Sequence, residues 1–98
     1  MKVTVNSIHF DADQKLLGFI DKKVNKLSTF DSSLISGQVY LKVEPVEQFL
    51  NKKAEIKLHS SDGELFASKQ CNSFEEAVDL AIDALRKQIL KHKEKKRA

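Results

Sequence analysis

A strict alternation of apolar and polar residues between positions 53 and 59 restricts the fold more than any other feature of this chain. Ala54, Ile56 and Leu58 fall on one face of an extended segment, and the residues that alternate with them are charged or polar. Residues 60–63 read Ser-Ser-Asp-Gly, a turn sequence with a glycine for positive φ, and residues 64–71 supply a returning strand. The sequence therefore predicts a hairpin with one face on a core and the other toward water or a polar partner.

Two further segments show the same period of two. Residues 2–8 alternate apolar and polar residues and include β-branched types, which is typical of a strand. Residues 36–43 place Val39, Leu41 and Val43 on one face, and Pro45 then opposes continuation of the strand. We therefore expect four strands in all.

Two segments show the helical period instead. Asp11 is the expected N-cap of the first helix, with Gln14 in the capping-box position, before an apolar face made of Leu16, Ile20, Val24 and Leu27. Ser73 and Glu76 form a capping box that opens the second helix, whose apolar face holds Val78, Ala81, Ile82, Leu85 and Ile89. This stripe stops beyond Leu90, so the last turns are expected to project past the sheet.

The order β-α-β-β-β-α, without an internal repeat or a linker, predicts a single α+β domain over residues 1–98. Cys71 is the only cysteine, so no disulfide can form within the chain and a reducing compartment fits best. The sequence contains neither an apolar run suited to a signal peptide nor one of about 18 residues suited to a membrane span. We expect a soluble, cytoplasmic binding module with no membrane partner.

Positive charge is concentrated at the C-terminal end. The chain has a net charge of +3, yet residues 86–97 hold seven basic residues against Glu94 alone, a local charge of +6, while the remainder carries −3. A run of this kind is typical of a surface that binds a polyanion, although a solvated Lys-rich helix end is an alternative. Like charges four residues apart repel, so the run is better explained if something outside the chain neutralises it.

The expected helices arrange basic residues in lines. Lys15, Lys22 and Lys26 lie within about 40° of each other on the first helix, a pattern that ordinary solvated helices also show. On the last helix, Lys87, Lys91 and Lys95 occupy one flank, and the opposite flank holds Arg86, Lys93 and Arg97. If the helices pack side by side, parts of these lines would form a positive groove that could follow phosphates.

No set of residues suggests catalysis or a cofactor. His9, His59 and His92 lack the spacing of a zinc site, and Cys71 ends a strand without a basic triad nearby, which favours a packing role over a nucleophilic one. Capping accounts for Asp11 without a divalent ion. We therefore expect a protein that is not an enzyme and has no metal, cofactor or small-molecule substrate.

Three segments, in this order and spacing, resemble the family of ribosome hibernation-promoting factors and ribosome-associated inhibitors. They are Ala54–His59, Asp62–Ser68 and Lys91–Lys95. The resemblance implies a fold like that of a double-stranded RNA-binding domain, with both helices on one face of the sheet. It also implies binding to the small ribosomal subunit near the decoding and tRNA sites, which would block translation in idle or stressed bacteria.

The same resemblance implies which residues contact small-subunit ribosomal RNA. By position these are Lys22, Lys23, Lys26, Lys87, Lys91, His92, Lys93 and Lys95, and by charge alone Arg86, Lys96 and Arg97 follow. The chain resembles the short form of the family, so the formation of ribosome dimers, with or without a second factor, stays open.

Two alternatives remain. A true double-stranded RNA-binding domain has a Lys-rich start to its last helix, whereas Glu75, Glu76, Asp79 and Asp83 make this start acidic and would repel RNA. A protein-interaction module would use the outer face or the edge of the sheet, with the basic helix end serving only solubility.

Overall fold

The computed structural model describes residues 1–8, 10–44 and 51–97, the last three of these by their backbone. The elements follow in the predicted order β-α-β-β-β-α, with one 3-10 turn, η1, after the first helix. They are β1 (Lys2–Ile8), α1 (Gln14–Lys26), η1 (Leu27–Thr29), β2 (Leu34–Val43), β3 (Lys52–Ser60), β4 (Gly63–Cys71) and α2 (Phe74–Arg97).

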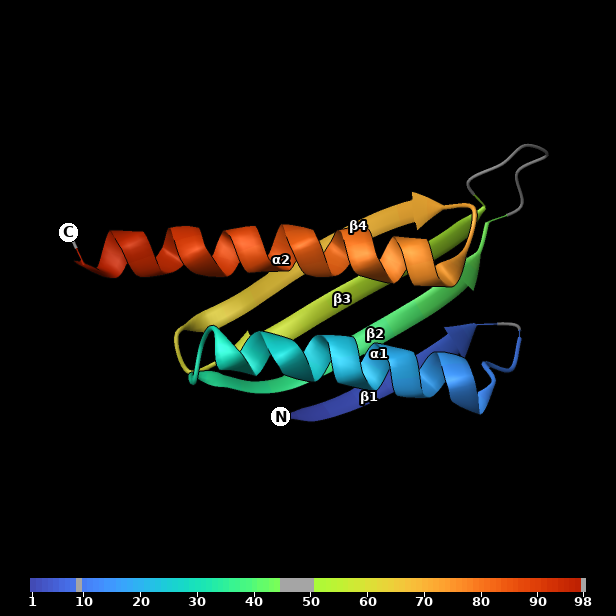
Figure 1. Cartoon of the computed structure of the whole chain (residues 1–98), viewed down its shortest axis with the longest axis horizontal. Coiled ribbons are helices and arrows are strands. Elements are labelled where there is room, and N and C mark those ends of the chain that lie inside the picture. Colours follow the sequence, from blue (N-terminus) through green and yellow to red (C-terminus); the bar gives the residue numbers. More distant parts are fainter. Residues whose placement is uncertain (9, 45–50, 98) are drawn as a thin grey trace.

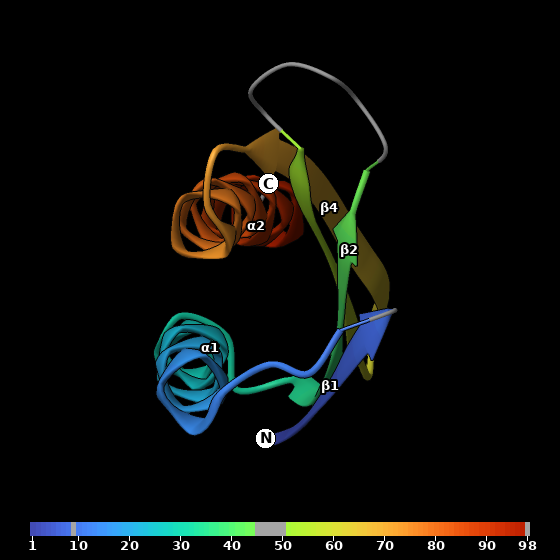
Figure 2. The same ribbon diagram turned by 90° about the vertical axis from the view of Figure 1, so that its right-hand side faces the viewer.

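The four strands form one mixed sheet in the order β1-β2-β3-β4. β1 runs parallel to β2, because α1 carries the chain back across the sheet between them. The other two pairs are antiparallel. Both helices cover the same face of the sheet, side by side, and the opposite face is left open (Figures 1 and 2). The predicted α+β architecture is confirmed.

The core lies between this sheet face and the two helices. Val39, Ile56 and Ala67 occupy one row across β2, β3 and β4, and all three are buried. Both helices pack onto this face of the sheet. α1 contributes Ile20 and Val24. α2 contributes a longer apolar stripe whose members are 0% exposed and include Ala77, Val78, Ala81, Leu85 and Ile89. The alternation that predicted the inward residues of the hairpin is thereby confirmed.

The β3–β4 hairpin turns as the sequence predicts. Ser60 pairs with Gly63 across the turn, and Gly63 has a φ of 134°, a conformation that L side chains rarely adopt. The Ser60 hydroxyl donates a hydrogen bond to the Gly63 carbonyl (2.9 Å) and accepts one from the Asp62 amide (3.2 Å). The turn residues therefore fix the register of the hairpin.

One predicted helix cap is confirmed and one is wrong. The Ser73 hydroxyl accepts a hydrogen bond from the amide of Glu76 (3.2 Å) at the start of α2. At the start of α1, however, Asp13 and not Asp11 is the N-cap, and its carboxylate accepts a hydrogen bond from the Leu16 amide (2.8 Å). The backbone is still extended at Asp13 (φ −74°, ψ 165°), so Asp11 lies too far before the helix to cap it.

Val43 also differs from its prediction. It continues the inward face of Val39 and Leu41, yet it is 42% exposed because it is the last residue of β2, where neither helix covers the sheet. His9 and the predicted strand break at Pro45 lie outside the described residues.

The C-terminal turns of α2 extend beyond the sheet, as the end of the apolar stripe predicts (Figure 1). The helix has 24 residues and is therefore about 36 Å long, in a molecule whose longest extent is 47 Å. Within the described part of the chain, no helix is long and apolar enough to cross a membrane. Basic side chains thus reach past the compact part of the fold.

Candidate nucleic-acid interface

The candidate basic residues come from the C-terminal half of α1 and from the second half of α2. Lys22 and Lys26 are exposed on α1, and Lys23 beside them is half-buried. On α2, His92 is half-buried, whereas four residues are exposed: Arg86, Lys87, Lys91 and Lys93. The backbone of residues 95–97 continues α2, which carries Lys95, Lys96 and Arg97 on the same projecting turns.

A groove of about 320 Å³ separates the two helices where these residues meet. Lys23 and Lys26 line it from α1 and Arg86 lines it from α2, so the structure brings Arg86 close to two candidates that lie far from it in the sequence. Its apolar lining consists of Leu27, Phe30 and Ile82. Part of the predicted positive groove is therefore present.

Two carboxylates from α2 also line this groove, which the sequence prediction did not include. Asp79 forms an ion pair with Lys23 of α1 (3.3 Å). Asp83 pairs with Arg86 (2.8 Å) and with Lys87 (3.2 Å) on its own helix. Three of the candidate cations are thus partly neutralised within the chain.

The ion pairs change the ionisation of Asp83. A hydrogen bond from Lys87, the charge of Lys87 and a smaller contribution from Arg86 hold the pKa of the Asp83 carboxyl below its usual range. The group is therefore an anion at neutral pH and competes with any external phosphate for these two cations. The spacing of three and four residues could have revealed these pairs in the sequence. The pairing of Lys23 with Asp79 required the packing of the two helices.

Four candidates remain available to an external anion. Among the residues that the structure describes, no carboxylate lies within ion-pair distance of Lys22, Lys26, Lys91 or Lys93. Lys26 lines the groove, Lys22 lies four residues before it on α1, and Lys91 and Lys93 belong to the projecting turns of α2. These lysines are the ones that can neutralise phosphates without first losing an internal partner.

The described residues offer no alternative site with catalytic chemistry. No group of three or more His, Cys, Asp and Glu side chains among them could hold a metal ion. The Cys71 thiol is buried, and desolvation together with the nearby Glu76 charge raises its pKa. It stays protonated at neutral pH and is a poor nucleophile. The basic helices are therefore the functional candidate that this part of the chain provides.

The chain is similar to known proteins over nearly its whole length. Residues 3–97 match the family described as sigma 54 modulation protein / S30EA ribosomal protein. The chain is 32% identical to the ribosome hibernation promoting factor of Azotobacter vinelandii, over 97% of this chain and 85% of that protein. It is 30% identical to the ribosome hibernation promoting factor of Escherichia coli K12, over 97% of this chain and 96% of that protein.

Two solved structures have the same fold. One is a ribosomal subunit interface protein from Coxiella burnetii, with a TM-score of 0.84 and 16% identity over 95% of this chain and 98% of that one. The other is the N-terminal domain of Protein Y from Thermus thermophilus, with a TM-score of 0.80 and 17% identity over 94% of this chain and 99% of that one. At these identities the likeness concerns the fold alone.

Proposed function

Because the chain belongs to the sigma 54 modulation protein / S30EA ribosomal protein family, we propose that it is a bacterial ribosome hibernation factor. In this proposal it acts in the cytoplasm of idle or stressed cells, where it binds the small ribosomal subunit near the decoding and tRNA sites and blocks translation. Relatives named ribosome hibernation promoting factor, similar over nearly the whole chain, support the role. The feature of this chain that most directly supports the proposed role is the projecting basic end of α2.

Small-subunit ribosomal RNA is the proposed direct partner. Lys22, Lys26, Lys91 and Lys93 are exposed and form no ion pair with a carboxylate in the described part of the chain, so they are the proposed primary phosphate contacts. Lys23, Arg86 and Lys87 are held by carboxylates of the chain itself and would add phosphate contacts only when those ion pairs are broken. His92, Lys95, Lys96 and Arg97 would extend the contact along the last turns of α2.

The proposed mechanism is occupation of a site and needs no chemical step. Lysine and arginine side chains on helices bind phosphates mainly by charge and by release of counterions, so the affinity depends little on base sequence. A folded domain held in this way at the decoding site would leave no room for tRNA or messenger. Pairing of ribosomes into dimers, with or without a second factor, would be a separate consequence of binding.

Co-sedimentation with ribosomes and isolated subunits on sucrose gradients tests this function. With about six phosphate contacts, the affinity should fall roughly a thousandfold between 50 and 200 mM salt. The bound protein should accompany the small subunit and intact ribosomes, and a heavier ribosome peak would report dimers. Absence of binding at low salt would refute the proposal and favour a protein-interaction module.

A charge-reversed double variant locates the contact. We expect Lys91→Glu combined with Lys93→Glu to abolish co-sedimentation, because two primary phosphate contacts become repulsive. Lys2→Glu combined with Lys69→Glu is the matched control, because both lysines are exposed, lie on the sheet and change the net charge by the same amount. Equal binding by the two variants would contradict an interface on α2.

A further inference from the structure

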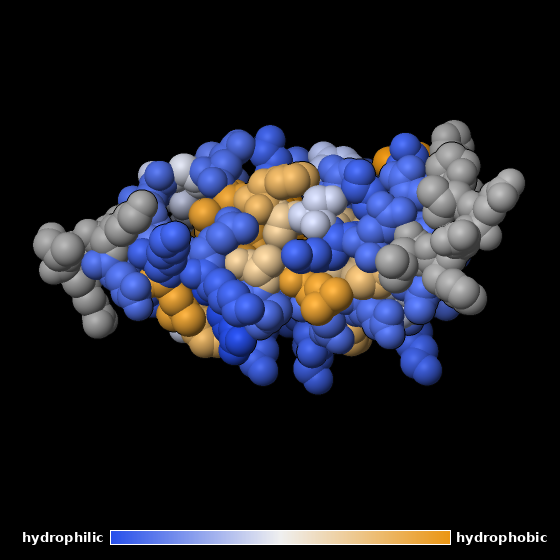
Figure 3. Space-filling view, turned by 90° about the horizontal axis from the view of Figure 1, so that it is seen from above, coloured by the Kyte–Doolittle hydropathy of each residue, from blue (hydrophilic) through white to orange (hydrophobic). Residues whose placement is uncertain are grey.

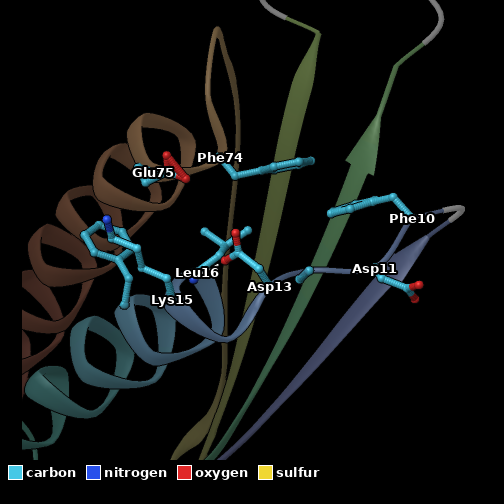
Figure 4. Close-up of a pocket in the computed structure, with 9 residues that line it drawn as sticks. Phe10, Asp11, Asp13, Lys15, Leu16, Phe74 and Glu75 are labelled. Carbon is cyan, nitrogen blue, oxygen red and sulfur yellow. Dashed lines mark hydrogen bonds between the residues drawn. The ribbon is translucent and has the colours of Figure 1, made fainter.

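A second hollow (Figure 4) lies where α1 and α2 begin, at the end of the molecule opposite the basic turns of α2 (Figure 1). It is an open hollow of about 570 Å³, bordered by residues 10–13 and by the beginnings of α1 and α2. Its volume falls within the roughly 300–1,000 Å³ that is usual for ligand sites. It is separate from the groove between the two helices that the proposed RNA contact uses.

Aromatic rings form much of the apolar lining of this hollow. Phe10 from the β1–α1 connection and Phe74 from the start of α2 stack, with ring centroids 4.9 Å apart and planes 8° from parallel. Leu16 and Phe19 of α1 and Ala12 contribute further apolar surface. Phe74 is nearly buried, whereas Phe10, Leu16 and Phe19 are each partly exposed. A ligand with apolar groups could therefore bury them against rings that are already in place.

The rim of the hollow is acidic. Among the described residues that line it, Asp11, Asp13 and Glu75 are acidic and Lys15 is the one cation, which gives these residues a net charge of −2. Figure 4 shows Asp13 between the apolar side chains and Glu75 at the start of α2 beside Phe74. Within the described residues, Glu75 has neither an ion pair nor a hydrogen bond from a side chain. This carboxylate is available to an external cation.

An anion is the less suitable occupant, although two helices begin here. The N-terminus of a helix favours negative charge through its free amides. At this end, however, the Leu16 amide already donates to the Asp13 carboxylate and the Glu76 amide donates to the Ser73 hydroxyl. The carboxylates on the rim would also repel a phosphate. RNA bound by the basic end of the molecule is therefore not expected to enter this hollow.

We propose that the hollow binds a lysine- or arginine-containing polypeptide segment of a protein partner. Lysine and arginine side chains combine a methylene stem, which can pack against the rings of Phe10, Phe19 and Phe74, with a cationic head that the acidic rim would attract. This inference goes beyond ribosome binding through RNA, because it assigns a protein contact to the opposite end of the same molecule. The molecule then has two ends of opposite chemistry, one for phosphates and one for a basic protein segment.

Titration of the isotope-labelled full chain with a peptide of alternating arginine and leucine, followed by NMR, tests this site. The expected result is that amide shifts of residues 10–19 and 73–75 change with the peptide concentration. Asp13→Asn combined with Glu75→Gln should weaken the peptide about tenfold, since two carboxylates are lost while asparagine still caps α1. Lys15→Glu should act in the opposite direction and bind the peptide more tightly.

The matched control is Glu64→Gln combined with Glu94→Gln, which removes two exposed carboxylates far from the hollow and should leave the affinity unchanged. Circular dichroism verifies that each variant is folded. Equal weakening by both double variants would overturn the proposal, because it would mean that only net charge matters. Shift changes at these residues caused by an oligoribonucleotide, or by raising the protein concentration without peptide, would also overturn it, since the occupant would then be RNA or a second copy.

Discussion

Replacing Asp83 with asparagine tests how far the chain's own carboxylates limit the cations that RNA can use. Asp83 holds Arg86 at 2.8 Å and Lys87 at 3.2 Å, and asparagine keeps the shape of the side chain but removes its charge. Both cations are then free to contact phosphates. Each additional phosphate contact steepens the dependence of log affinity on log salt by about 0.9, so two contacts add about 1.8. Between 50 and 200 mM salt, the variant should lose roughly tenfold more affinity than the unchanged protein.

The assay is co-sedimentation with small subunits over a series of salt concentrations, with the slope as the readout. Asp83→Asn should also bind more tightly than the unchanged protein at low salt. Glu64→Gln is the matched control, since it removes a carboxylate that holds Lys57 at 3.3 Å on the other side of the molecule. It changes net charge equally but frees no cation at the proposed interface. An unchanged slope for Asp83→Asn, or equal slopes for the two variants, would refute the reasoning.

Four further outcomes are expected. Ile89→Ala should lower the free energy of unfolding in urea by about 2–5 kcal/mol, because Ile89 is fully buried; a negligible change would mean that α2 does not pack as described. Asp13→Ala should cost about 1 kcal/mol in the same assay and Asp11→Ala much less, whereas the reverse order would restore Asp11 as the cap. The Cys71 thiol should react with iodoacetamide far more slowly in the folded protein than in urea, and fast reaction in the folded state would contradict its burial. Because hydrogen bonding and charge lower the pKa of Asp83, its stabilising pairs are present above the unfolded-state pKa of about 4 and are lost as pH falls through the lower folded value. The difference in melting temperature between Asp83→Asn and the unchanged protein should therefore disappear in acid and not at neutral pH.

Local signals in the sequence predicted most of the fold. The alternation around Ile56 identified the inward face of the hairpin, and the spacing of Ser73 and Glu76 identified the start of α2, because both features depend only on neighbouring residues. The cap of α1 was mispredicted since two aspartates, Asp11 and Asp13, can each serve as a cap. Only the backbone conformation before the helix distinguishes them.

The candidate site was predictable in part. The basic run on α2 is visible in the sequence, and so is the pairing of Asp83 with Arg86 and Lys87 once helical spacing is applied. The groove could not be predicted in detail, because Lys23 and Asp79 meet only when α1 and α2 pack on the same sheet face. The acidic hollow at the opposite end was missed for the same reason. It combines Phe10 and Phe74, which are far apart in the sequence.

The outer surfaces of the sheet and of α2 bear on the protein-interaction alternative. Seen from above the view of Figure 1, the side of the molecule that carries α2 and β4 shows apolar areas in its middle, bordered by hydrophilic residues (Figure 3). Phe66, Leu80 and Leu90 are among the large apolar residues that are about half exposed. Single exposed apolar residues are normal on protein surfaces. Loss of ribosome binding after charge reversal on α2, without change after Phe66→Ser on the open sheet, would separate the two accounts.

Competition for the small ribosomal subunit is the most direct test of the central proposal. Small subunits loaded with messenger and tRNA are mixed with increasing amounts of the labelled protein at low salt, and the tRNA that remains bound is measured together with the bound protein. We predict that the two bind in a mutually exclusive manner, and that Lys91→Glu combined with Lys93→Glu leaves tRNA in place. Simultaneous binding of the protein and tRNA to the same subunit would contradict the proposed occupation of the decoding site.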